Sequence, residues 1–274
     1  MKAADFRYER PVSLDDALAL LAQEDVDAMP LAGGQSLMPM MNFRMAQPEL
    51  LIDLNGISEL MGITIDDGHL KIGAMTRYSD LERAPEIAEH APLIATALPH
   101  IAHSAIRNRG TIGGSVALAD PAAEMPALLL ALGAQIGVQG PQGGRWISAD
   151  DFFLGVYETA RDDSELVTAL SIPIVQNGDR FGFYELARRH GDYAMAGVAI
   201  AHRTAFRIAF FSVSDRAVRA HKTEAILTQD PTAIDAAIAA LDEIEFNADL
   251  NGSEAAKRHY AGVVLRRALE GMQS

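Results

Sequence analysis

Two short glycine-rich segments contain the residues with the clearest chemical potential. The first reads Ala32-Gly33-Gly34-Gln35-Ser36-Leu37, and the second reads Gly110-Thr111-Ile112-Gly113-Gly114-Ser115. Each follows an apolar stretch and combines adjacent glycines with hydroxyl side chains. Adjacent glycines permit positive φ and let backbone N–H groups come close to a ligand. We therefore expect two converging loops that bind a pyrophosphate through backbone dipoles and hydroxyl donors.

The same segments can also be read as tight turns, and a Gly-Gly pair alone does not separate the two interpretations. The chain has no Gly-x-x-x-x-Gly-Lys-Ser/Thr sequence, so it lacks the P-loop signature. It also has no Gly-x-Gly-x-x-Gly between a strand and a helix with a following acid. A Rossmann dinucleotide-binding domain is therefore disfavoured.

Composition restricts the possible partners. The 274 residues include 23 Lys+Arg and 37 Asp+Glu, which gives a formal net charge of -14. Such a surface repels phosphate backbones, so nucleic acid is not expected as a partner. The chain has no cysteine. Disulfides, thiolate nucleophiles and iron–sulfur clusters bound by this chain are therefore excluded.

No targeting or membrane-spanning segment is expected. Residues Met1 to Arg7 lack the apolar core of a secretory signal. The most apolar stretch, Met125 to Val138, is too short to span a bilayer and contains Pro126 and Gly133. We expect a cytoplasmic protein.

The apolar pattern predicts an α+β fold in two domains, with a linker at residues 177–179. The first domain, before residue 176, is expected to be bipartite, and the smaller second domain to combine an antiparallel sheet with helices. The expected elements are a helix capped by Ser13, a strand at 51–54, a hairpin at 64–72 turning at Asp67-Gly68, helices through Leu81 and over 92–103, a loop at 110–115, a helix at 121–132 entered by Asp120-Pro121, strands at 181–186, 197–203 and 205–213, and helices at 216–227, 232–241 and 253–269.

Three segments together resemble a known family. In order and spacing, residues 32–37, 106–115 and 119–124 are similar to the FAD-binding medium subunit of the molybdenum hydroxylases, of the aerobic carbon monoxide dehydrogenase and xanthine dehydrogenase type. Residues 188–194 resemble the start of that family's C-terminal domain. The similarity extends from Phe6 to about Leu269.

The resemblance implies an FAD-binding domain of the vanillyl-alcohol-oxidase (PCMH) type, with two subdomains, over residues 1–175. A carbon monoxide dehydrogenase flavoprotein-type C-terminal domain would cover 176–274. It also implies the residues that contact FAD: Pro30, Leu31, Ala32, Gly33, Gly34, Gln35, Ser36 and Leu37 with Thr111, Ile112, Gly113, Gly114 and Ser115 around the diphosphate, Asp120 and Glu124 at ribityl or ribose hydroxyls, Ile101 and Leu166 near the flavin or adenine, and Tyr193 against the isoalloxazine.

Most of these residues also have a plainer interpretation. Asp120 suits a helix N-cap, and Glu124 suits a capping-box acid. Ile101, Leu166 and Tyr193 suit a hydrophobic core. The sequence alone leaves these alternatives open.

Neither a catalytic residue nor a metal ligand is expected on this chain. His100 and His103 have helical i, i+3 spacing, but no third ligand is evident nearby. Some relatives carry a lysine near the position of Tyr184, where positive charge can stabilise reduced flavin. Here that charge would have to come from Arg188, Arg189 or elsewhere.

The resemblance implies an electron-transfer subunit of a larger oxidoreductase. FAD would be bound here, while [2Fe–2S] clusters and molybdopterin would lie on a small iron–sulfur subunit and a large molybdenum subunit, assembled as a dimer of heterotrimers. Two alternatives remain open. One is a stand-alone FAD-dependent oxidase or dehydrogenase of the vanillyl-alcohol oxidase class, and the other is a non-catalytic assembly subunit without flavin.

Overall fold

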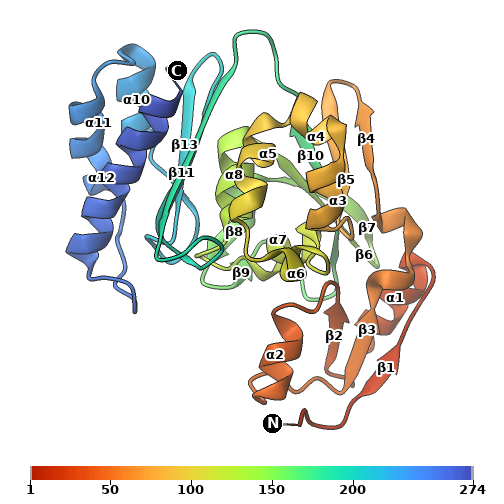
Figure 1. Cartoon of the computed structure of the whole chain (residues 1–274). Helices are drawn as coiled ribbons and strands as arrows, with labels where there is room; N and C mark the ends of the chain where they lie inside the picture. Colours follow the sequence, from red (N-terminus) through yellow and green to blue (C-terminus); the bar gives the residue numbers. More distant parts are fainter. Residues whose placement is uncertain (1, 273–274) are drawn as a thin grey trace.

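Three β-sheet units organise the chain in a computed structural model, which describes residues 2–272. A small N-terminal unit lies at one end of the molecule, a larger mixed unit occupies the middle, and a helix-covered sheet forms the far side (Figure 1). The expected α+β class, with a bipartite first part and an antiparallel sheet in the last part, is confirmed. No helix among the described residues has the length and apolar character needed to cross a bilayer.

The N-terminal unit is a parallel sheet with strand order β1-β3-β2. Its first helix begins after Ser13, whose hydroxyl accepts a hydrogen bond from the amide of Asp16, as the sequence predicts. Leu14 and Leu18 of this helix pack against Leu50 and Ile52 of the central strand. The unit comprises β1 (Arg7–Glu9), α1 (Leu14–Leu21), β2 (Ala28–Leu31), α2 (Leu37–Asn42), β3 (Leu50–Asp53), η1 (Leu54–Gly56) and η2 (Ser58–Leu60).

The middle unit contains a five-stranded antiparallel sheet of order β4-β5-β10-β6-β7. The expected hairpin turns at Asp67 and Gly68, which both have positive φ. Every residue of α8 is buried, so this helix forms the centre of the main core. The unit comprises β4 (Ile63–Asp66), β5 (His69–Gly73), α3 (Tyr78–Arg83), α4 (Pro85–His90), α5 (Pro92–Ala97), η3 (Leu98–His100), α6 (Ser104–Arg107), α7 (Ile112–Leu118), α8 (Glu124–Leu132), β6 (Gln135–Gly140), β7 (Gly143–Ser148), α9 (Ala149–Phe152), β8 (Phe153–Gly155), β9 (Glu158–Thr159) and β10 (Leu166–Pro173).

The C-terminal unit is a four-stranded antiparallel sheet of order β11-β12-β13-β14, covered on its outer face by three helices (Figure 1). Val198, Ile200 and Phe210 face these helices, whereas Ala199 and Phe211 join the core around α8. The alternation follows from the period of two along a strand. The unit comprises β11 (Arg180–Ala187), β12 (Ala194–His202), β13 (Phe206–Phe211), β14 (Val218–Arg219), α10 (His221–Gln229), α11 (Ile234–Ala239), η4 (Ala240–Glu243) and α12 (Glu254–Gly271).

Three expected helices have different limits in the structure. The helix expected over 92–103 stops at Ala97, and the chain continues as a 3-10 turn that contains Pro99, which has no N–H to donate. The helix expected from residue 121 starts at Glu124. The helix expected from residue 216 starts at His221, because Val218 and Arg219 pair with β13 instead.

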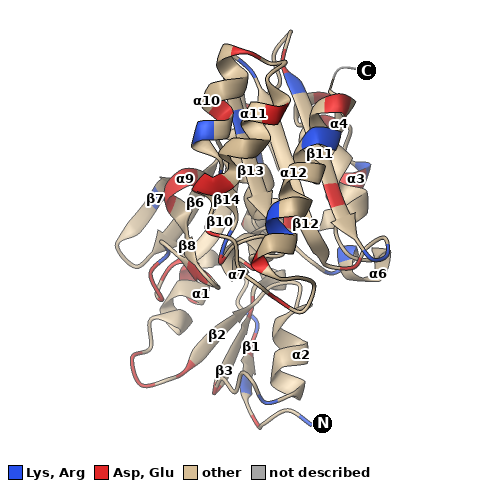
Figure 2. Cartoon of the chain, turned by 90° about the vertical axis from the view of Figure 1, so that its left-hand side faces the viewer, with Lys and Arg blue, Asp and Glu red and all other residues tan. Residues whose placement is uncertain are grey.

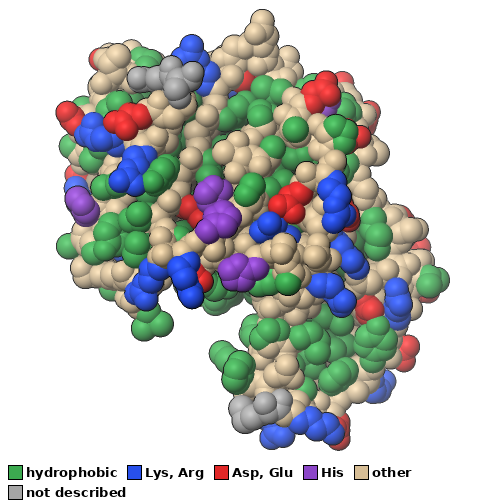
Figure 3. Space-filling view, viewed as in Figure 1, with side chains coloured by type: hydrophobic (Ala, Val, Ile, Leu, Met, Phe, Trp, Pro, Cys, Tyr) green, Lys and Arg blue, Asp and Glu red, His purple; other side chains and the backbone are tan. Residues whose placement is uncertain are grey.

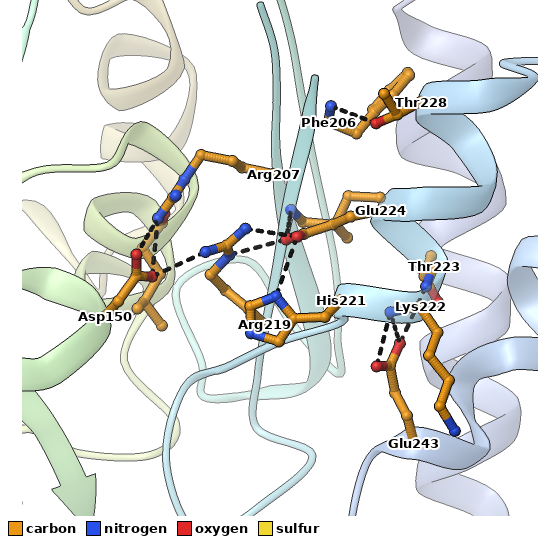
Figure 4. A network of polar contacts seen from close by, with 12 residues as sticks. Asp150, Phe206, Arg207, Arg219, His221, Lys222, Thr223, Glu224, Thr228 and Glu243 are labelled. Atoms are coloured by element: carbon orange, nitrogen blue, oxygen red, sulfur yellow. Dashed lines mark hydrogen bonds and ion pairs between the residues drawn. The ribbon is translucent and has the colours of Figure 1, made fainter. Parts of the chain in front are cut away.

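A polar network joins the C-terminal unit to the middle unit (Figure 4). Asp150, on the acidic turn α9 beside β14 (Figure 2), accepts hydrogen bonds from Arg207 at 2.8 and 2.9 Å and from Arg219 at 3.2 Å. Arg219 also binds the buried Glu224 through two hydrogen bonds of 2.9 and 2.5 Å. Arg207 donates to the carbonyl of Leu130 at 2.7 Å, at the end of α8. The network therefore fixes two strands and one helix against α8 and α9.

We expect Asp150→Ala to lower the free energy of unfolding by about 1–2 kcal/mol, because Arg207 and Arg219 lose charged acceptors at a partly exposed site. Urea denaturation measures the loss. The matched control is Asp151→Ala, which changes the adjacent exposed acid and should stay within about 0.5 kcal/mol of the wild type. Equal losses in the two variants would contradict the importance of the network.

Candidate functional site

A cleft of about 310 Å³ lies between the N-terminal unit and the middle unit, and both glycine segments line it. At least 73 sequence positions separate residues of the two segments, the nearest being Leu37 and Gly110, but both segments meet at this cleft, as expected from the sequence. The predicted site residues that line it are Pro30, Ala32, Gly33, Gly34, Gln35, Ser36 and Leu37 from the first segment, Thr111, Gly113, Gly114 and Ser115 from the second, and Leu166 from β10.

The two segments touch through their backbones. A Cβ added to Gly33 would lie 2.3 Å from the carbonyl oxygen of Arg109 and 2.7 Å from Cα of Gly110. A Cβ added to Gly113 would lie 2.4 Å from Cβ of Ala74. Real Cβ atoms do not approach so closely, so these glycines are required for close packing.

The first segment follows the carboxyl end of β2 and leads into α2. Asn55 holds it in place by donating to the carbonyl of Ala32 at 2.9 Å, and Asp53 in turn accepts from the Asn55 amide group at 2.6 Å. Gly34 has φ of +72°. Within residues 2–272, no acceptor is found for the backbone amides of residues 33–36. These amides are therefore available to an anionic ligand.

The second segment is not the loop that the sequence analysis expected. Thr111 caps α7 by accepting a hydrogen bond from the Gly114 amide at 3.2 Å, so Gly113 and Gly114 lie in the first helical turn. The amides of Ile112 and Gly113 donate to the carbonyls of Thr76 and Ala74. Here the glycines permit close approach and have no positive φ. The second segment contributes a wall and hydroxyl groups, whereas the free amides belong to the first segment.

Six predicted site residues lie outside the cleft lining: Leu31, Ile101, Ile112, Asp120, Glu124 and Tyr193. Ile101 and Ile112 belong to the buried core.

Asp120 accepts a hydrogen bond from the amide of Ala122 at 2.9 Å, so it closes a turn before α8 and does not cap the helix. The plainer interpretation of Asp120 as an N-cap was therefore wrong.

Asp120 and Tyr193 are neighbours. Burial and the nearby charge of Asp120 raise the pKa of the Tyr193 hydroxyl to about 12. The residue as a whole is 65% exposed. Tyr193 thus presents an aromatic surface to the exterior while its hydroxyl lies near Asp120, which is not the arrangement of a core tyrosine.

Lys257 of the C-terminal helix α12, which sequence reasoning missed, holds the backbone beside Asp120 and beside Tyr193. Its Nζ is fully buried and donates to the carbonyls of Met195 at 2.9 Å and Ser212 at 2.6 Å, and it pairs with Asp249 at 2.7 Å. Ser212, with φ of +61°, donates its amide to the carbonyl of Pro121. Lys257 therefore ties the turn after Asp120 to the start of β12, next to Tyr193. The sequence did contain one indication of this role, because a lysine within the apolar stripe of a helix is expected to have a buried polar partner.

Two charged residues of the cleft were also missed, Arg161 and Glu165. Arg161 donates to the carbonyl of Glu165 at 2.7 Å, which shapes the turn before β10. Arg145 binds the Glu165 carboxylate at 2.9 and 2.8 Å and holds its pKa below the usual range. The carboxylate is thereby neutralised, and Arg161 can face an anion. No sequence pattern distinguishes these residues from an ordinary polar loop.

The side chain of Tyr184 is directed toward α12 and not toward the cleft. Its hydroxyl accepts a hydrogen bond from Arg267 of α12 at 2.5 Å, and the guanidinium lies 5.1 Å from the ring centre. His100 and His103 do not share a helix, because η3 ends at His100 and α6 starts after His103. Among the described residues, no three His, Cys, Asp or Glu side chains converge as metal ligands.

Glu124 is only 8% exposed, and burial, together with the charges of Glu185 and Asp120, raises its pKa to about 8. The folded chain therefore holds this proton more tightly than the unfolded chain. Its contribution to stability is fully present below the unfolded pKa of about 4.5 and declines as pH rises to about 8.

We expect Glu124→Gln to remove this decline. Between about pH 5 and 8 the wild type should lose up to about 1.4 kcal/mol of unfolding free energy per pH unit relative to the variant. Urea denaturation across this pH range measures the difference. Parallel curves for the two proteins would show that Glu124 is ionised in the folded chain at neutral pH.

Comparisons with known proteins show the family of the chain. A family model described as the FAD binding domain in molybdopterin dehydrogenase matches residues 4–175, and one described as the CO dehydrogenase flavoprotein C-terminal domain matches residues 182–272. The carbon monoxide dehydrogenase medium chain of Hydrogenophaga pseudoflava is 40% identical over 96% of both chains. The nicotine 6-hydroxylase medium subunit of Paenarthrobacter nicotinovorans is 37% identical over 98% of both.

Solved structures show the same similarity in three dimensions. A structure of carbon monoxide dehydrogenase from Hydrogenophaga pseudoflava matches with a TM-score of 0.96, covering 100% of this chain and 99% of that one at 40% identity. Quinoline 2-oxidoreductase from Pseudomonas putida 86 matches with a TM-score of 0.93 at 36% identity, over 99% and 98% of the two chains. The chain therefore belongs to the FAD-binding medium subunits of the molybdenum hydroxylase family, whose members are parts of oxidoreductases.

Proposed function

We propose that this chain carries FAD and transfers electrons within a multi-subunit molybdenum hydroxylase. The observation that carries the proposal is the cleft between the two glycine segments, where the amides of residues 33–36 are unpaired within the described part of the chain. When bound, FAD supplies redox chemistry that can proceed in one-electron or two-electron steps.

The residues of the cleft suit the diphosphate of FAD. Four free amides and the hydroxyls of Ser36 and Ser115 are donors, and Arg161 adds one positive charge. Backbone donors of this kind bind phosphate oxygens without a cluster of lysines. That chemistry is consistent with a chain of net charge -14. Leu166, which lines the cleft, would contact an apolar part of the cofactor.

The isoalloxazine would lie near the exposed ring of Tyr193, with Asp120 close to the ribityl or ribose hydroxyls and Glu124 behind them. Support comes from the position of Tyr193, whose hydroxyl lies near Asp120 and whose ring remains accessible. Ile101 and Ile112 would support the site from the core. In this arrangement the first domain, 1–175, binds FAD, and the second domain, 176–274, holds Tyr193 in place.

Electrons would arrive from [2Fe–2S] clusters on a small partner subunit and leave to a terminal acceptor. The absence of cysteine means that thiolate-ligated clusters must belong to another chain. Molybdopterin would lie on a large partner subunit, and the proposed assembly is a dimer of heterotrimers in the cytoplasm. The names of the relatives, which are medium chains and medium subunits, support a shared complex.

We expect Gly114→Val to weaken FAD binding by about 100-fold, or about 3 kcal/mol. A Cβ at this position would lie 2.9 Å from Oγ1 of Thr111 and 3.4 Å from Cβ of Ala32, so the valine would fill the space between the segments. Flavin absorbance after reconstitution and desalting measures retention, and circular dichroism verifies the fold.

The control for this variant is Gly144→Val in β7, where an added Cβ would have an ordinary contact of 3.4 Å with the Val138 carbonyl. This variant should retain FAD like the wild type, because a β-branched residue suits a strand. Full FAD retention in a folded Gly114→Val chain would place the cofactor elsewhere.

The electron-transfer role is tested by reconstitution with the partner chains. We expect the FAD of this chain to be reduced by the substrate of the complex only when the iron–sulfur and molybdenum subunits are present, as followed by bleaching of flavin absorbance. Reduction of the isolated chain by a small-molecule substrate would favour a stand-alone oxidase or dehydrogenase. A chain that cannot be loaded with FAD would favour a flavin-free assembly subunit.

A further inference from the structure

A chain of hydrogen bonds crosses the three-stranded sheet of the N-terminal unit and ends at the first glycine segment. This unit forms a lobe that a notch separates from the rest of the molecule on the face shown in Figure 3. Tyr8 of β1 donates its hydroxyl hydrogen to Oδ2 of Asp53, the last residue of β3. Oδ1 of this carboxylate accepts from the backbone amide of Asn55 at 3.0 Å and from its side-chain amide at 2.6 Å. The Asn55 side chain also donates to the carbonyl of Ala32, which directly follows β2, at 2.9 Å.

The hydrogen bonds of the Asn55 side chain determine which way its amide group faces. The acceptors are Oδ1 of Asp53 and the carbonyl of Ala32, so only the NH₂ end can face them, with one hydrogen for each. Asp53 is itself held, because it is 7% exposed and lies 3.7 Å from Nε of Arg10. The donor is therefore fixed behind the first glycine segment.

This donor fixes the peptide group between Ala32 and Gly33. The peptide is trans, and the carbonyl and the following N–H of a trans peptide point in opposite directions. Asn55 binds the carbonyl but does not line the cleft, whereas Gly33 does. The N–H of Gly33, which has no acceptor within residues 2–272, is therefore directed away from Asn55 and toward the cleft.

The glycine at position 33 makes such an anchor necessary. A Cβ there would lie 2.3 Å from the carbonyl oxygen of Arg109, so only glycine fits. Glycine offers little steric resistance to rotation of the adjoining peptide group. Without Asn55, this peptide group would be free to turn its carbonyl oxygen toward the cleft, where the oxygen would repel a phosphate.

We propose that Asn55, oriented by Asp53 and Tyr8, is a positioning residue that keeps the Gly33 amide directed into the cleft, toward the phosphate oxygens of the ligand. The three side chains are not among those that line the cleft, so they act through the Ala32–Gly33 peptide group. The hydrogen-bonded chain is a property of this protein alone. Its effect on the cofactor rests on the proposed FAD-binding function.

A simpler role would be confined to the fold of the N-terminal unit. Asp53 caps η1 by accepting from the backbone amide of Asn55, which explains one of the hydrogen bonds. The cap does not explain the bond from the Asn55 side chain to Ala32, 23 positions away in the sequence. The two roles predict different results, because a cap affects folding and not the direction of the Gly33 amide.

Titration of the full chain with FAD, followed by flavin fluorescence, tests the positioning role. We expect Asn55→Ala to raise the dissociation constant about tenfold, because one donor to a charged ligand is no longer held in place. Asn42→Ala makes the same change at an exposed asparagine of the same unit and should bind FAD like the wild type. Equal dissociation constants in Asn55→Ala and the wild type would overturn the proposal.

Variants of Asp53 separate orientation from charge. Asp53→Ala should also weaken FAD binding about tenfold, whereas Asp53→Asn keeps an acceptor for Asn55 and should stay within about threefold of the wild type. The double variant Asp53→Ala/Asn55→Ala should be within about twofold of Asn55→Ala, because both residues act through one peptide group. Urea denaturation verifies that each variant is folded. Additive losses, or an Asp53→Asn variant as weak as Asp53→Ala, would overturn the proposal.

Amide NMR of the chain without FAD tests the orientation of the peptide group directly. In Asn55→Ala the signals of Gly33 and Gly34 should broaden, because the peptide group exchanges between two orientations on the μs–ms timescale. Asn42→Ala should leave both signals sharp. Sharp and unshifted signals in Asn55→Ala would overturn the proposal.

The positioning role and the proposed function fail separately. A wild-type chain that binds no FAD, but whose Gly33 signal broadens in Asn55→Ala, would refute the proposed function and leave the positioning role in place. A chain that binds FAD equally well with and without the Asn55 side chain would do the reverse.

Discussion

Backbone lies directly against backbone where the Ala32–Leu37 segment meets Arg109 and Gly110, and the cleft depends on this contact. A single methyl group at Gly33 would overlap the Arg109 carbonyl. Because the two segments come from different sheet units, their contact also fixes the N-terminal unit against the middle unit. Side chains could not provide the same geometry, since they would fill the space that a ligand needs. The free amides of residues 33–36 remain accessible for this reason.

The C-terminal unit acts on the same site from the opposite direction. The ammonium group of Lys257 in α12 donates hydrogen bonds to the carbonyls of Met195 and Ser212. Ser212 has a left-handed backbone conformation, which costs free energy in a residue other than glycine. The hydrogen bond from the Ser212 amide to the Pro121 carbonyl stabilises that conformation, and so does the hydrogen bond from the Lys257 ammonium group to the Ser212 carbonyl. The position of Tyr193 is therefore determined by a residue more than sixty positions away in the sequence.

Most of the features that were predicted correctly from the sequence depend on the types of neighbouring residues. The glycine pairs, the Ser13 cap and the Asp67-Gly68 turn have local causes, so the sequence was sufficient to anticipate them. The helical conformation of Gly113 and Gly114 was not predicted, because glycine disfavours helices and this turn depends on distant carbonyls at Thr76 and Ala74.

Residues whose roles depend on long-range contacts escaped sequence reasoning. Asn55 and Arg161 are polar residues of ordinary local context, and only the folded chain brings them to the site. Lys257 stands out only as a lysine within the apolar stripe of α12, and its bonds to distant carbonyls could not be anticipated. The outward orientation of Tyr184 depends on the register of β11, which the sequence does not specify. The limits of α8 and α10 differed because a turn at Asp120 and a strand pair at Val218 took precedence over helical periodicity.

The apolar interior is continuous between the middle and C-terminal units. Phe211 and Ala199 belong to the cluster that surrounds α8. A Cβ added to Gly197 would lie only 2.0 Å from Cζ of the Phe211 ring, so the ring needs a glycine at this position. An evolutionary exchange of C-terminal parts between related flavin subunits must therefore preserve the sizes of these side chains in matched sets. Chimeras that join the front half of one relative to the back half of another would inherit mismatched interiors, and natural recombination at this junction should be correspondingly rare.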